Sequence, residues 1–219
     1  PAVPRIEVDR IAYLNMPPTL LDFSINSQSW MWDFGNGDSS TDRVPTYSYS
    51  NIGTYNISLT INDTATVGDI LKVLPDRTVP YTSEEAVYGG DFETTEEDFG
   101  VDTKSGTAWV KGSSTVFGKS GTASGSSAWV TGLTNNLYAN DTETYLYTPN
   151  FDLSDPAIYE LKFNGKQLMN NTINNLGGIT INTPYSIEIK TLENIRKLNI
   201  VFTDLPLIQI VTNDEIKNI

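Results

Sequence analysis

Trp32-Asp33-Phe34-Gly35-Asn36-Gly37-Asp38-Ser39-Ser40 is the stretch that decides the fold of the first third of the chain. Trp32 and Phe34 alternate with polar residues, which predicts that both are inward-facing positions of a β-strand. Gly35 and Gly37 both tolerate positive φ angles, so the strand ends at Gly35 and the chain reverses sharply. The stretch therefore predicts a strand followed by a tight turn.

Three polar residues of this turn, Asp33, Asn36 and Asp38, carry side-chain oxygens. Such side chains bond nearby backbone amides in turns. They are also the hard oxygen ligands that calcium prefers. The sequence leaves two interpretations open, a hydrogen-bonded turn and a calcium site.

A second strand signal lies in Gly53-Thr54-Tyr55-Asn56-Ile57-Ser58-Leu59-Thr60-Ile61, whose odd-numbered residues from Tyr55 onward are all apolar or aromatic. This period of two predicts a half-buried strand. Tyr49 and Tyr55 are large enough to fill a small core while each keeps its hydroxyl near the surface. Further short β-rich runs occur at 6–8, 20–25, 29–34 and 70–74. Together these runs predict a small antiparallel sandwich.

In order and spacing, these motifs resemble the PKD family over about 70 residues. The matching positions are Trp32, Asp33, Gly35, Gly37, Tyr49, Gly53 and Tyr55. Asn36 replaces the common aspartate, and Tyr47 stands where histidine is frequent. The resemblance implies an immunoglobulin-like sandwich over residues 1–75.

The composition excludes several classes of partner and of active site. The chain of 219 residues has a formal net charge of −13 and contains neither cysteine nor histidine. An excess of negative charge repels nucleic acids and anionic membranes, so we expect neither as a partner. Disulfides, thiol nucleophiles and Ser-His-Asp triads are excluded. No run approaches the 18 apolar residues of a membrane span. We expect an exported, extracellular or cell-surface protein whose export signal has already been removed.

Prolines at both ends of residues 75–80 indicate a linker, which we assign to residues 76–87. Beyond it the composition shifts toward Gly, Ser and Thr, and later toward Asn. Strand candidates are 109–110, 128–130, 145–147, 159–163, 178–182, 185–190, 198–202 and 207–211. We therefore predict a second β-sandwich over residues 88–219 and an all-β fold class for the whole chain.

The second part resembles jelly-roll modules of the carbohydrate-binding and MAM-like kind, over about residues 88–163. The motifs are Gly90-Asp91-Phe92-Glu93-Thr94, the stretch 121–131 and the stretch 145–154. The aspartate-rich, Trp-containing stretch that usually follows is missing or altered after Phe163. The resemblance implies a structural calcium at Asp91 and Glu93, joined by Asp152 or Asp155. The alternative is a pair of solvated acids on an edge strand.

Aromatic residues of the second part are candidates for stacking on sugar rings. They are Trp109, Trp129, Tyr138, Tyr145 and Tyr147. The alternative is core packing, above all for the two tryptophans, which sit in strand-like runs of small and β-branched residues. The loop around Tyr138, with Asn136, Asn140 and Asp141, is the expected exposed ligand site.

We expect a non-catalytic binding module whose partner is a polysaccharide or a surface protein, with carbohydrate as the first choice. The alternative is a structural spacer or adhesin stalk without a small-molecule ligand. A hydrolase fragment is not expected, because the adjacent acids Glu96-Glu97-Asp98 cannot flank a sugar ring as a glycosidase pair does.

Overall fold

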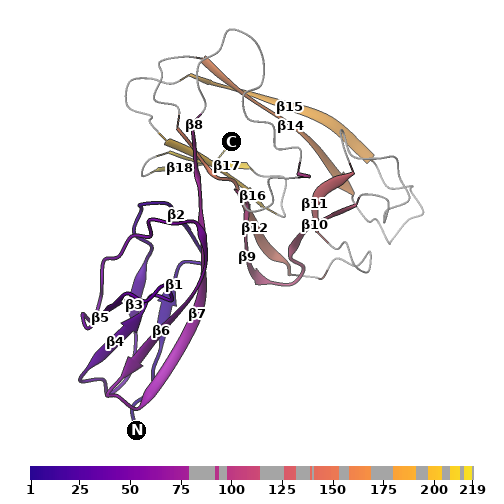
Figure 1. Ribbon diagram of the computed structural model, residues 1–219. Helices are drawn as coiled ribbons and strands as arrows, with labels where there is room; N and C mark the ends of the chain where they lie inside the picture. The colour runs from indigo at the N-terminus through magenta and orange to yellow at the C-terminus, as the bar shows by residue number, and fades with distance from the viewer. Residues whose placement is uncertain are drawn as a thin grey trace.

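The computed structural model describes residues 1–78, 92–93, 98–113, 126–131, 139, 141–152, 158–168, 180–190, 197–203, 208–212 and 215–218. Every regular element in these ranges is a β-strand (Figure 1). Within them no helix has the length and apolar character to cross a membrane. The predicted all-β class is confirmed.

The N-terminal domain is a sandwich of two sheets. The smaller sheet pairs β1 (Ile6–Val8) with β3 (Leu20–Asp22) in antiparallel register. The larger sheet has the strand order β2-β7-β6-β4-β5. Its strands are β2 (Ile11–Tyr13), β4 (Trp30–Asp33), β5 (Ser39–Ser40), β6 (Gly53–Ile61) and β7 (Ala65–Leu74). The predicted immunoglobulin-like sandwich is thus present in strands β1 to β7.

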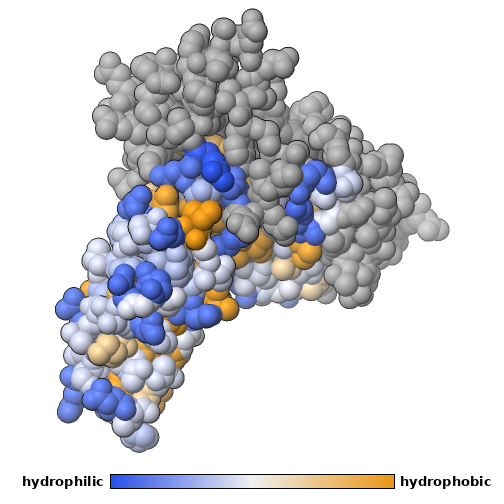
Figure 2. Space-filling view, in the orientation of Figure 1, coloured by the Kyte–Doolittle hydropathy of each residue, from blue (hydrophilic) through white to orange (hydrophobic). Residues whose placement is uncertain are grey.

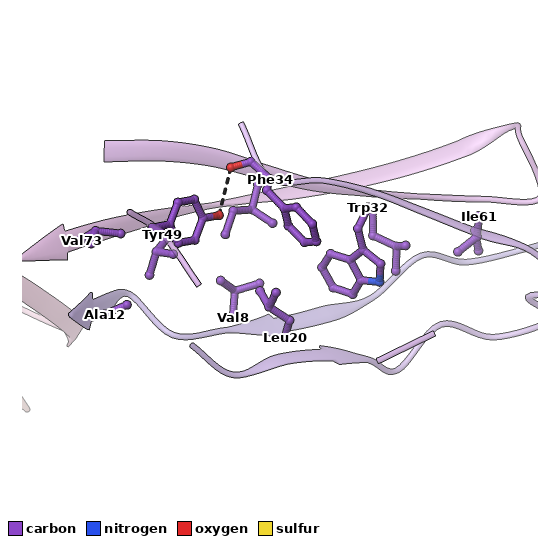
Figure 3. Close-up of a cluster of buried hydrophobic side chains, with 11 residues drawn as sticks. Val8, Ala12, Leu20, Trp32, Phe34, Tyr49, Ile61 and Val73 are labelled. Carbon is purple, nitrogen blue, oxygen red and sulfur yellow. Dashed lines mark hydrogen bonds between the residues drawn. The ribbon is translucent and has the colours of Figure 1, made fainter. Parts of the chain in front are cut away.

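The core of this domain lies between the two sheets (Figure 3). Trp32 and Phe34 project inward, with 0% and 2% of their surfaces exposed, as their alternation predicts. Tyr49 is also buried, and its hydroxyl donates a hydrogen bond of 2.9 Å to the carbonyl of Phe34. A buried phenol requires such a partner because an unpaired hydroxyl would pay its full desolvation penalty.

Strands β6 and β7 form the long hairpin of the larger sheet. In β6 the residues Ile57, Leu59 and Ile61 are buried, and the residues between them are more exposed. The strand alternation expected from the sequence is therefore confirmed. At the tip, Asn62 and Asp63 have φ angles of 51° and 53°. Asn and Asp are the non-glycine residues that best tolerate this left-handed region, so they suit the hairpin turn.

The second part contains three separate sets of described strands. The largest sheet has the order β18-β17-β16-β12-β9, with β13 and β8 joined to it through β16. Two hairpins, β10–β11 and β14–β15, form separate two-stranded sheets. The bounds are β8 Asp76–Thr78, β9 Gly100–Ser105, β10 Trp109–Ser113, β11 Ser127–Thr131, β12 Glu143–Tyr147, β13 Asn150–Asp152, β14 Ile158–Leu168, β15 Thr180–Lys190, β16 Lys197–Thr203, β17 Ile208–Thr212 and β18 Glu215–Asn218.

Two details differ from the sequence expectation. Residues 76–78 were assigned to a linker, but they form β8, which pairs in parallel with β13. The backbone thus stays extended from β7 through Pro75 into the second sheet (Figure 1). Residues 178–182 and 185–190 were expected to be separate strands, yet β15 runs through Pro184. Proline is tolerated there because a strand of a two-stranded sheet has one unpaired edge.

Candidate ligand-binding cleft

The turn after β4 is closed by its own polar side chains. Asp33 Oδ1 accepts a hydrogen bond from the Gly35 amide at 2.8 Å, and Asn36 Oδ1 accepts one from the Asp38 amide at 3.1 Å. The Tyr47 hydroxyl donates to Asp38 Oδ2, and this hydrogen bond is the main reason why the pKa of Tyr47 is raised. The observed contacts are those of the hydrogen-bonded turn.

Glu93, a predicted calcium ligand, accepts four hydrogen bonds from the start of β11. Its Oε1 faces the amides of Ser126 and Ser127 at 2.8 and 2.6 Å. Its Oε2 faces their hydroxyls at 2.9 and 3.3 Å. An ionised carboxylate has about four lone-pair sites, so these donors saturate Glu93 in the arrangement described. Asp91 lies outside the described residues, and so does the side-chain environment of Asp152. Within the described residues, no three acidic side chains gather to hold a metal ion.

This contact predicts a pH-dependent stability of the β10–β11 hairpin. The amides and hydroxyls of Ser126 and Ser127 lower the pKa of Glu93. A carboxyl group with a depressed pKa contributes stability above its unfolded pKa, about 4.3 for Glu, and loses it as the pH falls through the folded value. We expect opening of the hairpin to increase below about pH 4, and Glu93→Gln to remove that pH dependence.

Hydrogen exchange of the β11 amides between about pH 5 and pH 3 measures this effect. Glu7→Gln serves as the control, because Glu7 is an exposed carboxylate of the N-terminal domain. Equal pH profiles for wild type and Glu93→Gln would show that the hydrogen bonds between Glu93 and the two serines do not stabilise the hairpin.

The two tryptophans of the second part lie on one face of the β10–β11 hairpin. Trp109 is opposite Thr131, and Trp129 is opposite Lys111 in the antiparallel register. Both rings are half-buried, and the Trp129 ring lies 6.0 Å from that of Phe99, which is itself 4% exposed. The packing interpretation fits these residues better than an open sugar-stacking platform.

The loop expected to bind ligand falls mostly outside the described residues. Asn136, Tyr138 and Asn140 lie there, and their site remains a prediction. Asp141 is described; it is exposed and has a φ of 56°.

The junction between the two domains is held by polar contacts that the sequence did not indicate. Tyr13 in β2 donates its hydroxyl to the carbonyl of Thr148 at 3.1 Å. Lys72 in β7 donates its Nζ to the carbonyl of Phe99 at 2.6 Å. The amide of Asn150 bonds the carbonyl of Pro75 at 3.1 Å. Each bond joins the N-terminal domain, or the strand leaving it, to the second sheet.

An ion pair and close packing reinforce this junction. Arg77 Nε lies 2.8 Å from Asp98 Oδ2, and the second arm of the guanidinium contacts Oδ1 of the same carboxylate. Asp98 is buried, so the bidentate geometry gives it a charged partner in a site with little water. At Gly100 an added Cβ would lie 2.4 Å from Cδ1 of Ile11, so a glycine permits β9 to approach β2. These contacts fix the two domains relative to each other.

Beside this junction lies a cleft of about 380 Å³ with walls from both domains. One wall is the segment Glu7–Ile11, which runs from β1 into β2. The other wall is the outer face of the second sheet, with Asp102, Lys104, Tyr145 and Tyr147. This volume lies within the range of about 300–1,000 Å³ that is typical of small-molecule sites. In Figure 2 the visible surface of the N-terminal domain is mostly pale to blue, and hydrophobic residues appear both near the junction and along one side of the domain.

Strand alternation and pairing explain why the tyrosines and Asp102 meet. Tyr145 and Tyr147 are two residues apart in β12, and Tyr145 is opposite Asp102 of β9. These side chains therefore share one face of the sheet. The buried Thr144 and Leu146 project to the opposite face. The two tyrosine rings are 6.5 Å apart with planes at 48°, so they present an angled aromatic surface to the cleft.

Tyr147 is a polar group of the cleft with unused hydrogen-bonding capacity. Its hydroxyl makes no hydrogen bond to any residue in the described part of the chain. Burial, followed by the nearby charge of Asp102, raises the pKa of Tyr147 to about 12. The phenol is therefore protonated at neutral pH and presents a hydrogen-bond donor.

The sequence identified part of this cleft. It placed Tyr145 and Tyr147 among the sugar-stacking candidates, but it gave no role to Glu7, Asp9 or Asp102. The acids are scattered over nearly a hundred residues of chain without a motif. Only the pairing of β12 with β9 and the docking of the two domains bring them together.

Comparison with known proteins supports the interpretation of the N-terminal domain. The family model for the PKD domain matches residues 21–72. The pre-pro-metalloprotease PrtV of Vibrio cholerae is 35% identical over 80 residues, which are 35% of this chain and 9% of that protein. The chain thus spans less than a tenth of the curated relative. The likeness to that protease lies in its PKD domain.

Three solved structures are also similar. The PKD1 domain of PrtV from V. cholerae has 32% identity and a TM-score of 0.29, and it covers 33% of this chain and 95% of that domain. The PKD1 domain of Epp from Vibrio anguillarum has 28% identity and a TM-score of 0.28, with 33% and 92% covered. A structure described as carbohydrate-binding modules of the β-sandwich superfamily has 14% identity, a TM-score of 0.32, and coverage of 100% and 98%.

The family match covers the β3–β7 region, where the Trp32 strand, the glycine turn and the Gly53–Ile61 strand lie. The sequence motifs, the sandwich that they form and the family model agree over the same residues. The N-terminal part of this chain belongs to the PKD domain family.

Proposed function

We propose that this chain is a non-catalytic binding module of an exported bacterial protein and that its ligand is a carbohydrate. The observation that carries the proposal is the cleft at the domain junction. It combines two tyrosine rings with carboxylates, cationic groups and a phenol donor. Sugars are bound by such sets because flat rings pack on the apolar face of a pyranose and polar groups bond its hydroxyls.

The extracellular location also receives support from the comparisons. The PKD domain is similar to PKD domains of PrtV and Epp. The proposal needs no catalytic group, which agrees with a chain that lacks histidine and cysteine.

A glycan array with the whole chain tests this function, and Tyr147→Ala is the informative variant. We expect Tyr147→Ala to weaken binding of the selected glycan about tenfold, because it removes both a ring face and a hydroxyl donor. Tyr147→Phe retains the ring and removes only the hydroxyl, so its loss should be smaller, about two- to fivefold. Titration calorimetry gives the dissociation constants.

Tyr138→Ala compares the cleft with the loop site predicted from the sequence. Loss of binding in Tyr138→Ala but not in Tyr147→Ala would assign the ligand to the loop and not to the cleft. The array is repeated with calcium and with a chelator, and dependence on calcium would support the predicted structural cation. A blank array in both conditions would contradict carbohydrate binding.

A structural spacer is the second candidate, and the junction favours it. The extended β7–β8 connection, the Arg77–Asp98 ion pair and the bonds of Tyr13 and Lys72 hold the two domains in one relative orientation. A fixed orientation is what a spacer requires. This function predicts binding of a protein partner and no binding of glycans.

A further inference from the structure

The PKD domain supplies charged side chains to the cleft. Glu7, Asp9 and Arg10 form its charged wall on the N-terminal side, although all three belong to the PKD domain. Asp9 is held in place because its Oδ2 accepts a hydrogen bond from the Thr19 amide at 2.7 Å. The contacts across the junction keep this wall opposite the tyrosines of β12. The cleft is therefore preformed and depends on both domains.

The charges of the cleft do not balance. Arg10 Nη1 lies 2.9 Å from Asp69, and Lys104 Nζ lies 2.7 Å from Asp102, so a carboxylate already neutralises each cation of the lining. Glu7 and Asp9 make no ion pair within the described part of the chain. Two negative charges thus remain uncompensated beside the ligand space, in a protein whose formal net charge is −13.

This imbalance selects among carbohydrates. A uronic acid would bring a carboxylate against Glu7 and Asp9, and like charges at short range repel. A protonated amine would be attracted by both carboxylates. It would also be stabilised by the faces of Tyr145 and Tyr147, because aromatic rings attract cations. The raised pKa of Tyr147 keeps its phenol neutral. Tyr147 therefore adds no charge of its own to the cleft.

We infer that the PKD segment Glu7–Arg10 is one wall of a composite site that prefers sugars bearing a protonated amine. This inference rests on the proposed carbohydrate function and specifies the ligand class of the same cleft. It also assigns to the PKD domain a direct part in recognition.

Three oligosaccharides of equal length test the preference: tetramers of glucosamine, N-acetylglucosamine and galacturonate. Calorimetry uses the whole chain at a pH where the amine is protonated and the carboxylates are ionised. We expect the glucosamine tetramer to bind about three- to tenfold more tightly than its acetylated counterpart, and the galacturonate tetramer most weakly. The preference should shrink as salt is added, because solvent-exposed charges are screened.

Two matched variants separate a local effect from a general attraction between a polycation and an acidic protein. Glu7→Gln should reduce the preference for glucosamine over N-acetylglucosamine about two- to fivefold. Asp63→Asn removes the same charge at the exposed tip of the β6–β7 hairpin, where asparagine also suits the left-handed φ. It should leave the preference intact.

The outcomes distinguish a failure of the proposed carbohydrate binding from a failure of the inferred preference for amines. Binding of none of the tetramers overturns the proposed function and this inference with it. Binding of the acetylated tetramer without an advantage for glucosamine overturns the inference alone. Equal losses in Glu7→Gln and Asp63→Asn also overturn it, because the preference would then belong to the overall charge of the protein and not to the cleft.

Discussion

Trp32→Ala is expected to destabilise the PKD domain by about 3–5 kcal/mol. Trp32 is fully buried between the sheets, where it packs with Leu20 and Leu59 in the same core. Removing the indole loses its burial and leaves a cavity that the two sheets cannot close completely. Its Nε1 has no hydrogen-bond partner among the described residues, so the substitution loses packing and no hydrogen bond.

Hydrogen exchange of the β6 amides in the whole chain measures this loss, because core amides of a domain exchange through its global opening. Met31→Ala is the matched control, since Met31 is the neighbouring residue in β4 and is 44% exposed. It should change the opening free energy by less than about 0.5 kcal/mol. Similar effects of the two substitutions would contradict the placement of Trp32 at the centre of the core.

Gly35→Ala is expected to destabilise the same domain by about 3 kcal/mol, from two sources. Gly35 has a φ of 74°, in the left-handed region that disfavours residues with a Cβ by about 1–2 kcal/mol. An added Cβ would also lie 2.6 Å from the carbonyl oxygen of Asn56 in β6. Backbone of a paired strand cannot move aside as a side chain can, so the turn or the β4–β6 pairing must distort.

Gly37→Ala in the same turn separates these two sources. Gly37 has a φ of 100°, but an added Cβ there would meet nothing within 4 Å. It should show only the conformational part, about 1–2 kcal/mol. The same exchange measurement on the β6 amides reports both variants. Equal losses at the two glycines would mean that the approach of Asn56 contributes nothing.

The fixed orientation of the PKD domain and the second sheet affects where a ligand can bind. A PKD domain on a free linker would hold its neighbour at a distance, and neither would influence the other's ligand. Here β8 carries the backbone directly into the second sheet, and Gly100 lets β9 pack against Ile11. A ligand site between the domains becomes possible because their separation and orientation are fixed.

Much of the PKD domain could be predicted from local signals. The alternation from Tyr55 to Ile61 specifies one buried face, and Gly35 and Gly37 specify a sharp turn whatever surrounds them. Sequence patterns with a period of two report burial directly, because successive side chains of a strand point to opposite faces. The glutamate at position 93 was found as a polar site residue, but its partners Ser126 and Ser127 lie more than thirty residues away.

The sequence by itself determined most strands of the PKD domain, its glycine turn and the aromatic candidates Tyr145 and Tyr147, but it did not indicate β2 or β5. The tertiary structure alone decided that residues 76–78 form a strand, that Glu93 is saturated by serine donors, and that Glu7 and Asp9 face Asp102 across a cleft. The physical reason is the range of the interactions. Alternation and turn geometry act over a few residues and leave a local pattern. Pairing of β8 with β13 and docking of two domains join distant segments, and no local pattern records which distant surface a residue will meet.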